Sequence, residues 1–113
     1  HTPETHLMID AERLALLGPR AYLINVARGE IVDEEALVDA LRERTIAGAG
    51  LDVYADEPHI SPALISLENV VLLPHMGSAT IEGREAAGTK VIANIKAGAD
   101  GHRPPDQVLE GWV

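Results

Sequence analysis

Three polar residues of this chain, Arg28, Glu57 and His75, each follow a short apolar segment. The segments are, in order, AYLINVA, AGAGLDVYAD and VVLLP. Short segments rich in Val, Ile, Leu and Ala, separated by helical stretches, are typical of buried parallel strands. In an open parallel sheet, ligands bind outside the carboxyl ends of the strands. We therefore expect a cation, a carboxylate and an imidazole to meet at one edge of a sheet.

These three groups suit the reduction of a 2-oxo acid. The guanidinium of Arg28 is always charged and can hold a carboxylate through two hydrogen bonds while it polarises the neighbouring carbonyl. The imidazole of His75 can give and regain a proton near neutral pH, as the protonation of an alkoxide requires. Glu57 can accept a hydrogen bond from the other ring nitrogen and so fix the tautomer. No side chain supplies a hydride, so a cofactor must supply it.

Each of these residues also has a plainer interpretation. An arginine after a strand is often a surface ion-pair partner, a loop glutamate is often solvated, and a histidine after proline is equally compatible with a structural role. Asp52 is more informative, because it lies inside the apolar segment AGAGLDV and a buried carboxylate must be paired or hydrogen-bonded. His1 and His6 flank a turn with no third ligand nearby, so we expect no metal site.

Composition limits the possible partners. The 113 residues carry 18 acidic and 9 basic side chains, a formal net charge of −9, so nucleic acid and anionic membranes are unfavourable partners. No apolar segment approaches the roughly 20 residues that span a bilayer, and no signal peptide is visible. Cysteine is absent, which excludes disulfides and thiol chemistry. These features fit a cytoplasmic protein with an aliphatic core.

The order of elements predicts an α/β fold with a three-stranded parallel sheet. Asp10 and Asp33 are candidate caps of two helices, and a stripe of Ala87, Val91, Ile92 and Ile95 predicts a packed face on a third. One edge of so small a sheet would lie open, so we expect this to be half of a larger sheet. The expected helices span 10–17, 33–45 and 78–97, the strands 21–26, 47–53 and 70–73, and a short turn 62–67.

Three blocks of the sequence carry a family resemblance: INVARGEIVDEEALVDAL, AGAGLDVYADEP and NVVLLPHMGSAT. Together with HTPET and DAERLALLGPRAYLIN, they resemble the C-terminal portion of the D-isomer-specific 2-hydroxyacid dehydrogenases, in that family's order and spacing. The resemblance covers residues 1 to about 98. It implies the C-terminal half of a doubly wound, Rossmann-like parallel sheet that is incomplete as a chain. Residues 1–80 would belong to the dinucleotide-binding domain, and residues 81–113 would return to a substrate domain.

The resemblance also implies roles for individual residues. The family's catalytic arginine, glutamate and histidine fall on Arg28, Glu57 and His75. The implied cofactor is NAD or NADP, and the substrate is a small 2-oxo or 2-hydroxy acid. The family's aspartate beside the nicotinamide carboxamide falls on Asp52. The residues that would contact the cofactor are Val26, Ala27, Arg28, Asp52, His75, Gly77 and Thr5.

The segment HMGSAT is similar to the glyoxylate/hydroxypyruvate reductase and 2-ketogluconate reductase branch of the family. The alternative is a dinucleotide-sensing interaction protein like the family's corepressors, which typically carry bulkier, aromatic residues after the histidine. The family's Gly-rich phosphate loop has no counterpart in these residues, so we expect a fragment that is inactive alone and whose full-length form is a homodimer. Its tail would pack through Val108, Leu109 and Trp112. A self-standing or domain-swapped oligomer is the other possibility.

Overall fold

The computed structural model describes residues 1–108. Its chain divides into two compact units, residues 1–76 and residues 77–113, which are described separately. Of the tail residues expected to pack, Val108 is 67% exposed, whereas Leu109 and Trp112 lie outside the described residues. Among residues 1–108, no helix is both long and apolar enough to cross a membrane.

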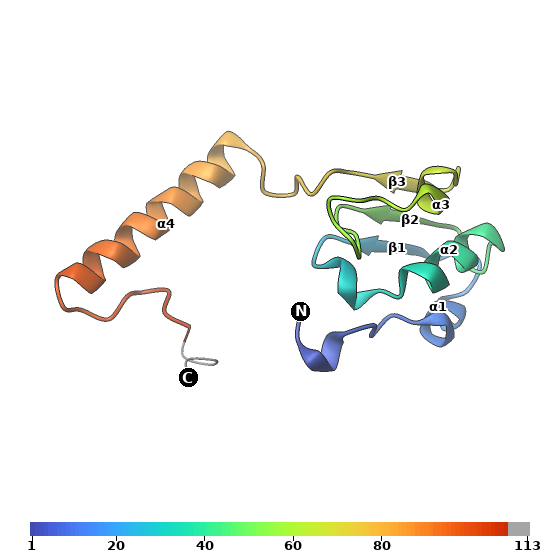
Figure 1. The fold of residues 1–113 in the computed structure, drawn as a ribbon, viewed down its shortest axis with the longest axis horizontal. Helices are drawn as coiled ribbons and strands as arrows, with labels where there is room; N and C mark the ends of the chain where they lie inside the picture. The colour runs from blue at the N-terminus through green and yellow to red at the C-terminus, as the bar shows by residue number, and fades with distance from the viewer. Residues whose placement is uncertain (109–113) are drawn as a thin grey trace. The chain divides into compact units, whose positions relative to one another are not determined.

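A parallel three-stranded sheet forms the centre of the first unit (Figure 1). Its strands are β1 (Tyr22–Asn25), β2 (Gly48–Leu51) and β3 (Val70–Leu72). The strand order is β1-β2-β3, with Ile24 opposite Gly50 and Gly50 opposite Val71. The predicted α/β class and the three parallel strands are therefore confirmed, and the carboxyl ends of all three strands lie at one edge.

Capping residues start the two longer helices of this unit where the sequence predicts. Asp10 accepts a hydrogen bond from the backbone N–H of Arg13 and caps α1 (Ala11–Leu17), and Asp33 caps α2 (Glu34–Arg42). The expected end of α2 at residue 45 is wrong. Arg44 adopts a φ of 56°, in the left-handed region that does not continue an α-helix, and the helix ends before it.

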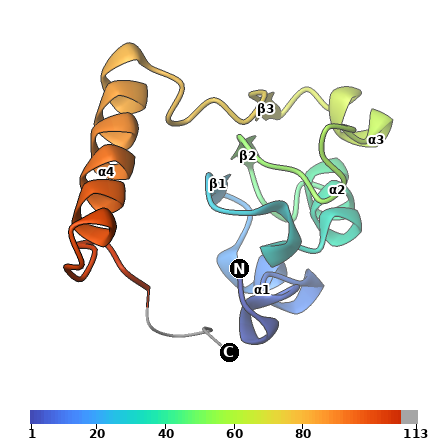
Figure 2. The same ribbon diagram turned by 60° about the vertical axis from the view of Figure 1, so that its left-hand side comes forward.

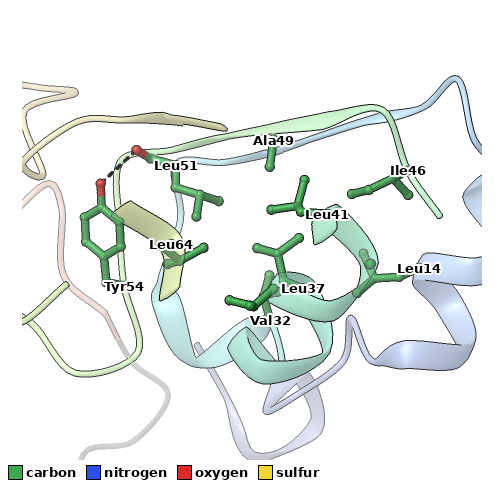
Figure 3. Close-up of a cluster of buried hydrophobic side chains, with 11 residues drawn as sticks. Leu14, Val32, Leu37, Leu41, Ile46, Ala49, Leu51, Tyr54 and Leu64 are labelled. Carbon is green, nitrogen blue, oxygen red and sulfur yellow. Dashed lines mark hydrogen bonds between the residues drawn. The ribbon is translucent and has the colours of Figure 1, made fainter. Parts of the chain in front are cut away.

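The core lies between one face of the sheet and the helices, including the short α3 (Pro62–Ile65) (Figure 3). Its fully buried side chains are aliphatic: Leu14, Leu37, Leu41, Ile46 and Leu64. The opposite face of the sheet carries exposed apolar side chains: Tyr22, Ile24 and Val71. Figure 2 shows α1, α2 and α3 gathered on the same side of the strands. The sheet is thus covered on one face by the described residues of its own unit.

The segment before α1 is fastened to the loop after β1. It begins with the 3-10 turn η1 (Pro3–Thr5), and the loop contains a second turn, η2 (Gly29–Ile31). Leu7 donates its backbone N–H to Glu30 at 2.8 Å, and Ile9 donates to Ile31 at 3.0 Å. The N-terminal segment therefore holds the loop that carries Arg28.

The second unit contains the long helix α4 (Ile81–Ala99). It begins three residues later than predicted, because the Thr80 side chain accepts from the backbone N–H of Gly83 and caps the helix there. The prediction that its apolar stripe is packed is wrong for this chain: Val91, Ile92 and Ile95 are all more than half exposed. Regular spacing gives a helix one apolar face, but it does not supply the surface that covers that face.

Candidate active site

The chain turns sharply at the end of β1, and the side chain of Asn25 shapes the turn. Its Nδ2 donates to the backbone carbonyl of Arg28 at 3.0 Å, and its Oδ1 accepts from the backbone N–H of Ala27 at 3.1 Å. The backbone carbonyl of Asn25 also accepts from the N–H of Asp52 at 3.0 Å. Asn25 is buried with both ends of its amide hydrogen-bonded, so the backbone around Arg28 is held at the edge of the sheet.

Glu57 and His75 form a short, direct hydrogen bond. His75 Nδ1 lies 2.7 Å from Glu57 Oε2, and the second carboxylate oxygen accepts from the backbone N–H of Tyr54 at 3.0 Å. His75 follows β3 and has a φ of 55°, a left-handed conformation that side-chain-bearing residues adopt rarely and that concentrates at functional sites. The side chains of His75 and Glu57 remain 47% and 34% exposed, so the pair is open to a ligand.

The contacts of Glu57 stabilise its charged form. The hydrogen bond from His75 is the main reason that the pKa of Glu57 lies below its ordinary value, followed by the backbone hydrogen bond from Tyr54. The positive charge of Arg28 lowers the pKa further, while partial desolvation opposes these effects. Glu57 is therefore a carboxylate at neutral pH and accepts the proton on Nδ1 of the ring. That bond leaves Nε2 as the nitrogen that can exchange a proton with a ligand.

Arg28 lies in the same pocket as this pair. The pocket has a volume of about 210 Å³, and its lining includes Arg28, Tyr54, Glu57 and His75. Arg28 Nη1 donates to the backbone carbonyl of Ala27 at 2.7 Å. A guanidinium carries five N–H donors, so this bond leaves donors for an anionic ligand. The cation, the carboxylate and the imidazole therefore meet at one edge, as their positions after the apolar segments predict.

The loop of Arg28 and the loop of Glu57 pack directly against each other at Gly29. A Cβ on Gly29 would lie 2.0 Å from the carbonyl carbon and oxygen of Tyr54, closer than any side chain can approach. Ala55, the next residue, donates its N–H to the Glu34 carboxylate of α2 at 2.9 Å. Glycine at position 29 thus lets two strand ends approach closely enough to share a pocket.

Asp52 is buried at the end of β2. Its Oδ1 accepts from the backbone N–H of Met76 at 2.8 Å, and the residue is 4% exposed. The hydrogen bond that a buried carboxylate requires is thus present, and it restrains the residue that follows His75. Whether Asp52 also contacts a nicotinamide stays a prediction.

The other residues expected to contact a cofactor occupy different positions. Val26 and Ala27 are exposed at the end of β1. Thr5 ends η1, and its hydroxyl is engaged with Thr2, whose backbone N–H it accepts at 2.8 Å. Gly77 begins the second unit and is therefore described apart from the pocket.

Two residues of this site were missed by sequence reasoning, namely Asn25 and Tyr54. Asn25 interrupts the apolar segment YLINV with a polar amide, and a buried amide needs partners, so the signal was present. Tyr54 is one of only two tyrosines in the chain, but nothing in its sequence neighbours indicates that its hydroxyl reaches the carbonyl of Leu73 while its backbone N–H donates to Glu57.

The family model for "D-isomer specific 2-hydroxyacid dehydrogenase, NAD binding domain" matches residues 1–77. The chain belongs to this family. The resemblance recognised in the three sequence blocks is therefore confirmed, as is the Rossmann-like parallel fold. The family description specifies NAD binding, so at the level of the family the expected cofactor class is confirmed as well.

Several relatives of the 2-hydroxyacid dehydrogenase family are similar in sequence. The glyoxylate reductase of Pyrococcus furiosus is 53% identical over 107 residues, which cover 95% of this chain and 32% of the relative. The 2-ketogluconate reductase of Gluconobacter oxydans is 50% identical over 95 residues, covering 84% of this chain and 31% of the relative. The chain thus spans about a third of the length of the curated relatives it matches.

A solved structure of the family shares the fold closely. The NADPH-dependent glyoxylate/hydroxypyruvate reductase of Sinorhizobium meliloti, in complex with NADP and malonate, superimposes with a TM-score of 0.93 at 47% identity. The match covers 96% of this chain and 34% of that protein. A glyoxylate reductase structure from Paecilomyes thermophila also has a TM-score of 0.93, at 33% identity.

The chemical groups at this edge fit the nicotinamide end of the family's cofactor. A carboxamide offers two N–H donors and one carbonyl acceptor. The edge carries the carboxylate of Asp52, which is 4% exposed, and the exposed residue Val26, whereas the N–H and the carbonyl of Ala27 are already hydrogen-bonded to Asn25 and Arg28. A carboxylate, the kind of group that accepts a hydrogen bond from a carboxamide, is thus present at the same edge as Arg28, Glu57 and His75.

Proposed function

We propose that the full-length protein, meaning the natural chain that contains these residues, reduces a small 2-oxo acid such as glyoxylate or hydroxypyruvate. The observation that carries this proposal is the 2.7 Å bond between Glu57 and His75 in the pocket that Arg28 also lines. It is supported by the glyoxylate and hydroxypyruvate reductases among the similar proteins. No observation favours the corepressor-like alternative.

In this mechanism Arg28 binds the substrate. Its free guanidinium donors hold the carboxylate, and the positive charge polarises the adjacent carbonyl as negative charge develops on oxygen. Arginine suits this task because its charge does not depend on pH in the physiological range. Asn25 holds the backbone of Arg28 at the edge of the sheet, and the guanidinium itself donates to the carbonyl of Ala27.

His75 acts as the acid. Glu57 accepts the Nδ1 proton, which leaves Nε2 as the nitrogen that exchanges a proton with the substrate. When NAD(P)H is bound, it supplies the hydride that reduces the carbonyl carbon. Nε2 then gives its proton to the alkoxide oxygen, so the carbonyl becomes a hydroxyl and the ring becomes neutral. In the reverse direction His75 takes the proton back.

The experiment is the substitution His75→Gln in the full-length protein, with glyoxylate and hydroxypyruvate as substrates. Losing the proton donor should lower kcat by a factor of about 10² to 10⁴, while the cofactor still binds. His6→Gln, an exposed histidine in the N-terminal turn, is the matched control and should retain full activity. Unchanged turnover in His75→Gln would exclude the acid role.

We further propose the domain organisation, the cofactor contacts, the oligomeric state and the cellular location that the sequence suggested. Residues 1–80 form the C-terminal half of a dinucleotide-binding domain, and residues 81–113 lead toward a substrate domain. The contacts with the cofactor are made by Val26, Ala27, Arg28, Asp52, His75, Gly77 and Thr5. The full-length protein works as a homodimer in the cytoplasm. Size-exclusion chromatography with light scattering tests the dimer, and a monomeric mass would contradict it.

A further inference from the structure

Tyr54 contacts all three parts of the chain that carry the candidate site. It is 3% exposed, and it follows β2 by three residues. Its carbonyl lies against Gly29, next to Arg28, and its backbone N–H donates to Glu57. Its hydroxyl lies 2.5 Å from the carbonyl oxygen of Leu73, the residue that follows β3 and stands two positions before His75. Three groups of this one residue, its carbonyl, its backbone N–H and its hydroxyl, thus lie at one edge of the sheet.

The Tyr54 hydroxyl donates its proton mainly to the carbonyl oxygen of Leu73, just after β3. The hydroxyl oxygen is 3.2 Å from the carbonyl oxygen of Leu51, the contact drawn in Figure 3, and only 2.5 Å from that of Leu73. One proton serves mainly the nearer acceptor, and 2.5 Å is at the short limit for a hydroxyl donor. Burial, aided by the nearby carboxylates of Asp52 and Glu57, raises the pKa of Tyr54, so the hydroxyl keeps this proton.

We propose that Tyr54 is a positioning residue, whose hydroxyl anchors the segment of His75 while its backbone N–H anchors Glu57, so that the two side chains stay within hydrogen-bonding distance. This inference rests on the proposed function only for its effect on catalysis. The geometry itself does not depend on the reaction, because both anchors are hydrogen bonds within the described residues. Only Pro74 lies between the anchored residue Leu73 and His75, so movement at Leu73 is passed on to His75.

The test is Tyr54→Phe in the full-length protein. Phenylalanine keeps the buried ring but removes the hydroxyl that donates to the carbonyl of Leu73. The first readout is the pKa of the Glu57 carboxyl, which is measured by an NMR titration. Since the bond from His75 is the main cause of the low pKa, loosening that bond should raise the Glu57 pKa toward its ordinary value. Loss of stability alone would not move this value in the folded protein.

The second readout is catalysis with glyoxylate. Because a small misplacement of an acid is costly, kcat should fall on the order of tenfold while the affinity for the cofactor is retained. Tyr22→Phe is the matched control: it removes the hydroxyl of an exposed tyrosine on β1 and should change neither readout. A Glu57 pKa equal to that of the unmodified protein overturns the positioning role. Absence of reductase activity in the unmodified protein overturns the proposed function instead.

If Tyr54→Phe does not fold, the exchange rate of the hydroxyl proton decides the question in the unmodified protein. Tyrosines labelled with ¹³C at Cζ report hydroxyl exchange with D₂O. A buried hydroxyl that donates to Leu73 should exchange much more slowly than that of Tyr22. Equally fast exchange at both tyrosines would show that the anchor to β3 does not exist.

Discussion

At the scale of single residues, the pKa of Glu57 reports whether its hydrogen bond with His75 is formed. Both of its carboxylate oxygens accept hydrogen bonds, one from His75 and one from Tyr54. Hydrogen bonds to the charged form of a carboxyl lower its pKa, and the bond from His75 contributes most here. The electrostatic state of Glu57 therefore depends on the geometry of its partner.

The full-length protein should show a Glu57 carboxyl that titrates below the ordinary value of about 4.5. Because the pKa is lowered by folding, the stability that it contributes is complete above the unfolded value and is lost as the pH falls through the folded value. His75→Gln should raise the Glu57 pKa, and His6→Gln should leave it unchanged. Carbon-detected NMR of labelled glutamate measures all three. An equal midpoint in both variants would contradict the direct bond.

The residues that carry chemistry were predictable, but those that position them were less so. Arg28 and His75 follow apolar segments, and the rule for parallel sheets places such residues at one edge. The amide of Asn25 bonds to Ala27 and Arg28, two and three residues away, so its polar interruption of an apolar segment was a usable signal. The hydroxyl of Tyr54, in contrast, bonds to Leu73, which comes near only after folding. Tyr54 and Leu73 are 19 residues apart in the sequence, and no local pattern indicates that they lie close together in space.

At the scale of elements, the close contact between the loop after β1 and the loop after β2 determines the pocket. Gly29 leaves no room for a Cβ against the carbonyl of Tyr54. Since the obstacle is backbone, it cannot yield by changing a rotamer. The two loops would have to separate, and Arg28 would move away from Glu57 and His75.

Gly29→Ala should therefore destabilise the full-length protein by about 1–3 kcal/mol and lower kcat/KM for glyoxylate. Gly98→Ala in α4 is the control, because an added Cβ there meets no atom of the described residues within 4 Å. That variant should keep its stability and activity, since alanine favours a helix over glycine. Thermal unfolding and steady-state kinetics measure both effects. Unaltered kinetics in Gly29→Ala would show that the pocket does not require this contact.

Element boundaries were predictable where the signal is local. Asp10 and Asp33 cap their helices through hydrogen bonds three residues away, within the range of sequence patterns. The end of α2 depends on the left-handed conformation of Arg44, which its residue type does not suggest. The stripe on α4 was interpreted as packed, whereas Val91, Ile92 and Ile95 are exposed in the described residues.

At the scale of the whole molecule, the sheet is packed on one of its two faces, and the candidate site lies at the edge where its strands end. The sheet is covered on the face that packs against Leu37, Leu41 and Leu64, and its other face exposes Tyr22 and Ile24. The chain corresponds to about a third of the relatives' length. Substrate and cofactor binding are therefore properties to measure on the full-length protein.

The central claim is that Glu57 acts through His75, within one catalytic unit. The most direct measurement is a double-mutant cycle of kcat/KM for glyoxylate in the full-length protein, with Glu57→Gln, His75→Gln and the double variant. Residues that act as a unit are not additive, so the double variant should be no slower than His75→Gln alone. Losses that multiply in the double variant would show two independent roles and would contradict the claim.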